Sequence, residues 1–308
     1  MEKYKAWLLL VLCNLFWAGN YVFGKYVVAD VTPLWITFSR WLMALVALLP
    51  IAHFFEKPDW RQAAKAWLPL LSMGILGVIG YNLLLYSALV YTSATNAALM
   101  NALNPGVIVL FSVFLLRERI SGFQAGGFVI SLIGVLVILT KGHLAQILQT
   151  RFNFGDLLMI AAVVVWTVYS IIGKRLSGVP PITATAVSTL WATVAMAPFA
   201  LAHPVAASHI SRLAVIGILY MVIFPSIGSF VFWNVAVRMI GVSEAGIFLN
   251  LIPVFTALLG LLLGEPISWA QIVGGLLVFV GVYLTTGMLE RKIAANTGAK
   301  SKLNAGGE

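Results

Sequence analysis

The sequence predicts an all-α integral membrane protein in which ten transmembrane helices form two inverted five-helix repeats around a central cavity. Three observations predict this fold class: a composition too apolar for a water-soluble globule, a succession of long apolar stretches, and a repeat that relates the two halves of the chain. A hydrocarbon core of about 30 Å requires roughly 20 apolar residues in each crossing helix.

The composition excludes most water-soluble classes of protein. The 308 residues are 61% hydrophobic and only 9% charged, with a mean hydropathy of +0.99. A soluble domain carries about 25% charged residues. A soluble enzyme, a nucleic-acid-binding protein and a disordered protein are therefore disfavoured. The net charge of +9 does not indicate nucleic acid, because the basic residues lie in connectors and in the tail. The single cysteine, Cys13, excludes a disulfide framework and a cysteine metal site.

Ten apolar stretches follow one another, separated by breaks that carry charges or turn residues. Backbone groups in lipid find no water, so each stretch is expected to be helical. The first stretch is too long for the core of a signal peptide, and nine more follow it. The shortest breaks lie near 90–94 and 237–242. The expected helices cover residues 7–28, 33–54, 67–89, 95–116, 122–140, 155–174, 182–201, 212–236, 243–263 and 268–287.

The basic residues predict the orientation. With the N-terminus in the cytoplasm, 14 of the 19 lysines and arginines are cytoplasmic, four are external, and Arg40 lies inside the second span. Cytoplasmic loops carry the excess of Lys and Arg. An even number of crossings then places the C-terminus in the cytoplasm, where residues 288–308 are expected to form a disordered tail.

A repeat relates residues 1–142 to residues 143–287 at an offset near 148. Pro33 and Pro50 recur as Pro181 and Pro198. Other matched pairs are Trp17 and Trp166, Gly80 and Gly228, Pro105 and Pro253, Gln124 and Gln271, Gly127 and Gly274, and Gly134 and Gly281. Five spans are an odd number, so the second half enters the membrane from the opposite side. Inverted repeats are typical of secondary transporters, whose substrate site lies at the repeat interface. A duplicated scaffold without transport is the alternative.

Polar side chains recur at membrane depth, where each one needs a partner or a wet cavity. On the first span Asn14, Trp17 and Tyr21 share a face, and the sixth span carries a matching one. Interhelical hydrogen bonding is the alternative explanation. The substrate-binding candidates are Asn14, Trp17, Tyr21, Asn82, Tyr86, Asn96, Asn101, Asn104, Trp166, Tyr169, Ser170, Trp233 and Asn234.

Three ionisable residues are candidates for energy coupling: Glu244, Asp156 and Arg40. Glu244 begins the ninth span, and its repeat partner is the neutral Asn96, so a proton-linked group would occupy one half only. A carboxylate that interacts with the helix dipole is the alternative for both Glu244 and Asp156. Arg40 corresponds to Ser188 in the repeat, so this charge too occurs in one half only.

Enzyme and channel functions are disfavoured. The chain has no HExxH sequence, no Walker-type loop and no G-x-S-x-G elbow. We therefore expect no enzyme, no metal site and no cofactor. A cation channel would need a ring of acids or carbonyls, and the chain has only ten acidic residues.

Several short motifs of the first half recur in the second, whereas Arg40 does not. The first half has Phe16-Trp17, Gly24-Lys25, Arg40, Ala97-Ala98-Leu99 through Pro105, Leu115 to Ile120, and Gly126-Gly127. The second half has Ala245 to Pro253, Leu263-Gly264-Glu265 and Gly274-Gly275. Their duplicated order over residues 6–287 resembles EamA-type members of the drug/metabolite transporter superfamily.

The resemblance implies ten helices with cytoplasmic termini in the inner membrane. It also implies a cavity lined by the first four helices of each half, with the fifth helices outside it, near a homodimer contact. The expected partners are a small-molecule substrate and the lipid bilayer, and no nucleic acid. The expected function is export of small metabolites such as amino acids, with aromatic ones favoured. The alternatives are a multidrug or cationic-compound exporter, a nucleoside exporter and a channel.

Overall fold

The computed structural model describes residues 2–91, 100–117, 120–145, 153–203, 210–262 and 267–286, together with Leu289. All the regular elements in these ranges are helical. The predicted all-α class is therefore confirmed. The candidate Asn96 and the tail expected over residues 288–308, apart from Leu289, lie outside the described residues.

Eight helices of the described part are long and apolar enough to cross a membrane, which makes the chain a multi-pass membrane protein. They are Glu2–Asp30, Pro33–Glu56, Trp67–Ala88, Gly122–Leu139, Phe154–Arg175, Pro181–Ala202, Arg212–Ile240 and Val242–Leu262. Two shorter apolar helices, Asn104–Leu116 and Trp269–Thr285, occupy the places of the fourth and tenth predicted spans.

Five of these ten helices contain short segments of different winding. The first half comprises α1 (Glu2–Asp30), α2 (Pro33–Ile51), η1 (Ala52–Glu56), α3 (Trp60–Lys65), α4 (Trp67–Met73), η2 (Gly74–Gly80), α5 (Tyr81–Tyr91), α7 (Asn104–Phe111), η3 (Ser112–Leu116) and α8 (Gly122–Leu139). The second half comprises α10 (Phe154–Arg175), α11 (Pro181–Ala202), α12 (Arg212–Met221), η5 (Val222–Ser229), α13 (Phe230–Ile240), α14 (Val242–Ile247), η6 (Phe248–Asn250), α15 (Leu251–Leu262) and α16 (Trp269–Thr285). The segments η1, η2, η3 and η5 are π-helical and η6 is a 3₁₀ turn.

Local sequence explains where several helices begin and end. Ser121 and Gln124 form a capping box at the start of α8, and Ser268 and Gln271 form the same box at the start of α16. A single residue, Gly241, separates α13 from α14, with a φ of 92° that favours glycine. This break is narrower than the predicted one at 237–242. The predicted helix 95–116 is interrupted by a turn, after which α7 begins at Asn104.

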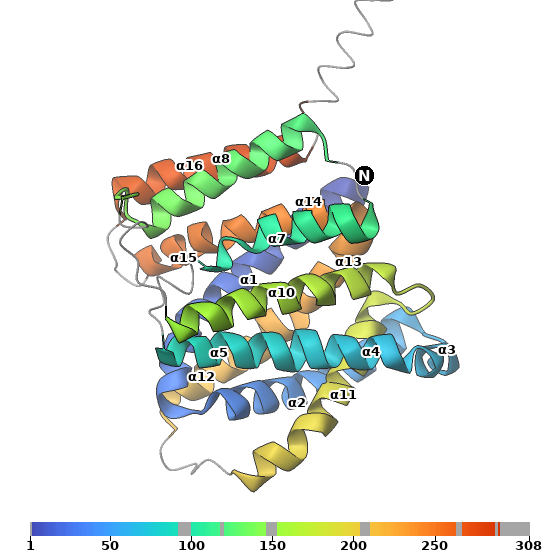
Figure 1. Ribbon diagram of the computed structural model, residues 1–308. Helices are drawn as coiled ribbons and strands as arrows, with labels where there is room; N and C mark the ends of the chain where they lie inside the picture. The colour runs from blue at the N-terminus through green and yellow to red at the C-terminus, as the bar shows by residue number, and fades with distance from the viewer. Residues whose placement is uncertain are drawn as a thin grey trace, which may run out of the picture.

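The helices pack in pairs that join the two halves. Figure 1 shows α8 and α16 side by side at one edge of the bundle. Elsewhere α1 packs against α12, α13 and α15, α10 packs against α5 and α7, and α2 packs against α11. These contacts leave α1 and α10 in the interior of the bundle, where polar side chains of both helices are buried.

Candidate functional site

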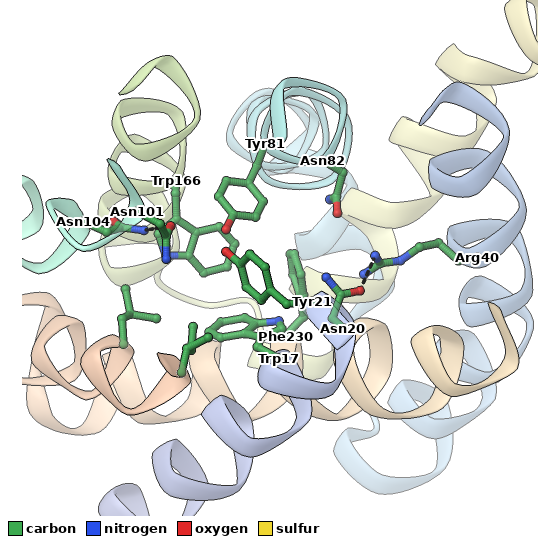
Figure 2. Close-up of a pocket in the computed structure, with 12 residues that line it drawn as sticks. Trp17, Asn20, Tyr21, Arg40, Tyr81, Asn82, Asn101, Asn104, Trp166 and Phe230 are labelled. Carbon is green, nitrogen blue, oxygen red and sulfur yellow. Dashed lines mark hydrogen bonds between the residues drawn. The ribbon is translucent and has the colours of Figure 1, made fainter. Parts of the chain in front are cut away.

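A cavity lies between helices of both halves. It encloses about 410 Å³ of empty space, its opening to solvent included. The lining residues are Trp17, Asn20, Tyr21, Arg40, Tyr81, Asn82, Asn101, Asn104, Trp166, Phe230, Leu249 and Ile252. They come from α1, α2, α5, α7 and the residues before it, α10, α13, η6 and α15 (Figure 2). None of them belongs to α8, α16 or α11.

Changes of helical winding place several lining residues. The π-helical η2 ends at Gly80, directly before Tyr81 and Asn82. In the second half η5 ends at Ser229, directly before Phe230. A π-helical segment inserts extra residues into a turn and so rotates the side chains that follow, and such segments are frequent at functional sites.

Aromatic rings form one wall of the cavity. The ring of Trp166 lies 5.1 Å from that of Trp17, 5.0 Å from that of Tyr81 and 5.4 Å from that of Phe230, measured between centroids. Trp17 and Trp166 are edge to face, at an interplanar angle of 84°. Such contacts hold the rings in place and present apolar surface for an aromatic or aliphatic ligand.

Arg40 stands at one end of the cavity and is only 1% exposed. Its Nε donates to Ser226 Oγ at 2.8 Å, and its Nη1 donates to Tyr86 Oη at 2.7 Å and to Asn20 Oδ1 at 3.1 Å. The guanidinium carbon also lies 5.4 Å from the centroid of the Trp41 ring. Among the described residues, the groups that accept hydrogen bonds from the guanidinium are therefore all neutral.

Asn101 and Asn104 stand at the other side of the aromatic rings from Arg40 (Figure 2). Asn104 Nδ2 donates to Asn101 Oδ1 at 3.5 Å. Asn104 Oδ1 and Trp166 Nε1 are buried and have no hydrogen-bond partner among the described residues. A ligand or water in the cavity would satisfy both atoms, since buried polar atoms are rarely left unpaired.

The predicted substrate-binding residues divide into two groups. Trp17, Tyr21, Asn82, Asn101, Asn104 and Trp166 line the cavity. The others in the described ranges bond to protein groups: Asn14 to the carbonyl of Leu10, Tyr86 to Asn20 and Arg40, Asn234 to Tyr169 and Thr185, and Trp233 to Ser170. Interhelical bonding, the alternative explanation, therefore describes the contacts of Tyr86, Asn234 and Trp233, whereas the bond of Asn14 lies within α1.

The coupling candidates occupy three different environments. Arg40 lines the cavity. Glu244 lies at the start of α14, where Trp7 Nε1 donates to Oε1 at 3.0 Å and Lys3 Nζ lies 3.4 Å from Oε2. Asp156 forms a capping box with Asn153 at the start of α10. Both carboxylates are buried at helix starts away from the lining set.

Sequence reasoning did not select Asn20, Tyr81, Phe230, Leu249 and Ile252 as site residues. Tyr81 and Phe230 follow π-helical segments, which displace them from the face that regular periodicity predicts. The glycines of η2 and Pro225 in η5 were the available signals of these irregular segments.

Comparisons with known proteins place the chain in a family. The EamA-like transporter family matches residues 4–140 and 153–287. The chain is 28% identical over 292 residues to an uncharacterized transporter, YyaM, of Bacillus subtilis, covering 94% of this chain and 96% of the relative. It is 30% identical over 288 residues to an uncharacterized transporter of Archaeoglobus fulgidus, covering 92% and 97%. A solved crystal structure of a protein superposes with a TM-score of 0.76 at 22% identity over 92% of this chain and 98% of the other, which shows the shared fold alone.

The matches with the family extend over both halves, so this chain belongs to the EamA-like transporter family of the drug/metabolite transporter superfamily. It is a multi-pass membrane transporter, and the names of its family and relatives indicate a protein that moves its substrate and does not transform it.

Proposed function

We propose that this protein is a secondary transporter of the cytoplasmic membrane that exports amino acids, aromatic ones favoured, by alternating access. One observation carries the proposal: a cavity lined by aromatic rings, amides and a buried arginine lies where helices of the two halves meet. The rings suit an apolar side chain, and the amides and the arginine suit polar and anionic groups.

Alternating access requires two similar halves, and the packing of α8 against α16 supports two inverted five-span repeats. A Cβ added to Gly127 would meet the carbonyl oxygen of Gly281 at 2.6 Å, and one added to Gly134 would meet that of Gly274 at 2.6 Å. The repeat matches Gly127 with Gly274 and Gly134 with Gly281. Applying the repeat to the contact between Gly127 and Gly281 therefore gives the contact between Gly274 and Gly134. The pair is antiparallel, as inverted repeats require.

A hydrogen bond near the cavity follows the same symmetry. Tyr86 Oη donates to Asn20 Oδ1 at 3.3 Å, and Asn234 Nδ2 donates to Tyr169 Oη at 2.7 Å. Positions 20 and 169, and positions 86 and 234, differ by about the offset of the repeat. The tyrosine and the asparagine have exchanged places between the halves, while the contact is the same. This supports two halves with equivalent architecture and different chemistry.

The topology of the proposal rests on the sequence, and the direction, export, rests on the family resemblance. The excess of basic residues in alternate connectors supports cytoplasmic termini. No nucleotide-binding loop occurs in the sequence, so an ion or substrate gradient would supply the energy. A cationic-compound exporter is less well supported, because the charge of Arg40 repels a cation in the cavity.

Flux in proteoliposomes tests the proposal. We expect protein-dependent, saturable movement of radiolabelled phenylalanine or tryptophan that excess unlabelled amino acid inhibits. Empty liposomes and a Trp17→Ala, Trp166→Ala double variant, which removes rings from the cavity wall, serve as controls. The absence of saturable amino-acid flux would refute the proposal that amino acids are the substrate. A non-saturating ion current would favour a channel.

A further inference from the structure

We propose that Arg40 binds an anionic group of the substrate, and that the cavity selects amphipathic organic monoanions, for which an α-ammonium group is dispensable. This inference rests on the proposed function, because it takes the cavity as the transport site. It extends the substrate class from amino acids to carboxylates that have an apolar or aromatic body and no ammonium group.

Arg40 carries a positive charge inside the bundle, where it is almost fully buried. A guanidinium stays protonated in proteins, and a buried charge is costly unless it is paired. The Asp and Glu side chains of the described ranges are engaged or placed elsewhere. Asp30 accepts from Ser211 N, Glu56 from Ile182 and Thr183, Asp59 from Arg61 and Gln62, Asp156 from Asn153 and Glu244 from Trp7 and Lys3, while Glu2 lies exposed at the start of α1.

Hydrogen bonds to neighbouring side chains hold the guanidinium in one orientation. Tyr86 donates its own proton to Asn20, and Ser226 donates its own to the carbonyl of Met221, so both hydroxyl oxygens are free to accept from Arg40. This fixes Nε and Nη1 against neutral oxygens. Nη2 has no hydrogen-bond partner among the described residues, and Arg40 lines the cavity. The arrangement leaves a fixed donor for a carboxylate oxygen, which forms the stronger, charge-assisted kind of hydrogen bond.

The residues that line the cavity offer no counterion to the ammonium group of an amino acid. No residue of the lining set is acidic. Asn20 Oδ1, an acceptor beside Arg40, already accepts from Arg40 Nη1 and Tyr86 Oη. An α-ammonium is attached one carbon away from the carboxylate, so it would lie close to the guanidinium without a counterion. The Arg40 end of the cavity therefore favours an anion over a zwitterion.

The body of the anion would lie along the aromatic wall. Tyr21 and Tyr81 extend toward each other between Arg40 and the asparagine pair, with Trp17, Trp166 and Phe230 beside them (Figure 2). An apolar ring or chain would bury its surface there, while the carboxylate reaches Arg40.

A four-compound series tests the inference on the full-length protein in nanodiscs by calorimetry. The probes are 3-phenylpropionate, phenylalanine, the neutral 3-phenylpropanamide and the cation 3-phenylpropylamine. A hydrogen bond to a charged group contributes about 1.5–3 kcal/mol, equivalent to about 10- to 100-fold in affinity. We expect 3-phenylpropionate to bind about 10- to 100-fold more tightly than the amide, and at least as tightly as phenylalanine, with the amine weakest.

Variants assign the preference to Arg40. Arg40→Gln should remove the difference between the carboxylate and the amide, and Arg40→Lys, which keeps the charge, should retain part of it. Ser39→Ala is the matched control: Ser39 bonds to the carbonyl of Trp35 on its own helix and does not line the cavity. If Arg40→Gln fails to fold, the comparison of carboxylate with amide on the parent protein still tests the preference for an anion, and Arg40→Lys tests the role of Arg40.

Three results would overturn the inference. Equal binding of carboxylate and amide would refute the anion site, and an unchanged preference in Arg40→Gln would refute the role of Arg40. An affinity for phenylalanine tenfold or more above that for 3-phenylpropionate would refute the inference that the ammonium group is dispensable. If none of the probes binds while tryptophan flux is measurable, the inference fails and the proposed function stands. If no amino-acid flux is measurable either, both fail.

Discussion

Gly127→Ala should destabilise the protein, while Gly126→Ala, one residue earlier on α8, should not. A Cβ at Gly127 would lie 2.6 Å from the carbonyl oxygen of Gly281, 2.8 Å from Thr285 Cγ2 and 2.9 Å from Leu284 Cβ. A Cβ at Gly126 would meet nothing within 4 Å. The two substitutions add the same methyl group to the same helix, so their difference isolates the contact between α8 and α16.

The size of the effect follows from these distances. Ordinary van der Waals contact begins at about 3.4 Å, so α8 and α16 must separate by about 0.8 Å at Gly127. The obstacle is backbone, which cannot rotate away, and overpacking of this kind costs about 1–3 kcal/mol. At Gly126 the only change is higher helix propensity, about 1 kcal/mol in favour of alanine.

Thermal unfolding in detergent, followed by tryptophan fluorescence, measures the difference. We expect Tm to fall by about 2–10 °C in Gly127→Ala and to stay level or rise in Gly126→Ala. Because α8 contributes no residue to the cavity lining, the transport rate per folded molecule should stay unchanged in both variants. Equal Tm values for the two variants, or a larger loss in Gly126→Ala, would refute the close packing of these helices.

Three further predictions concern topology, binding and coupling. In a Cys13→Ser background, His143→Cys should react with an impermeant maleimide in whole cells; reaction only after permeabilisation would refute the proposed orientation. Replacing both Asn101 and Asn104 by leucine should reduce transport at least tenfold while the protein still reaches the membrane, because the polar end of the cavity is lost; normal transport would assign both residues to packing. Glu244→Gln should make transport independent of an imposed pH gradient, whereas a parent protein that already ignores the gradient would exclude a coupling role for Glu244.

The membrane architecture and the family are readable from the sequence, because lipid imposes simple rules on it. Apolar length and the need to satisfy backbone hydrogen bonds predict where helices cross. Helical periodicity also places Trp17 and Tyr21 on one face of α1 and selects Trp166 on α10, and all three line the cavity. These inferences depend on neighbours in the chain, so no tertiary contact is needed to make them.

Periodicity cannot say which helix a side chain will meet. The sequence predicts Asn234 and Trp233 as substrate-binding residues, because they are polar or aromatic and lie at membrane depth. In the structure Asn234 bonds to Tyr169 and Trp233 bonds to Ser170, both on α10. The partners of Glu244 lie 237 and 241 residues away, on α1. Only the packing of distant helices decides whether a polar group faces a cavity or another side chain.

Two features of the site depend on the tertiary structure alone. The π-helical segments before Tyr81 and Phe230 shift the helical phase, so both rings reach the cavity from positions that regular spacing does not predict. The sequence by itself shows that Arg40 is a lone charge in an apolar span. The structure places it at the cavity among neutral acceptors, with none of the described carboxylates beside it, because hydrogen-bond partners and counterions come from other helices.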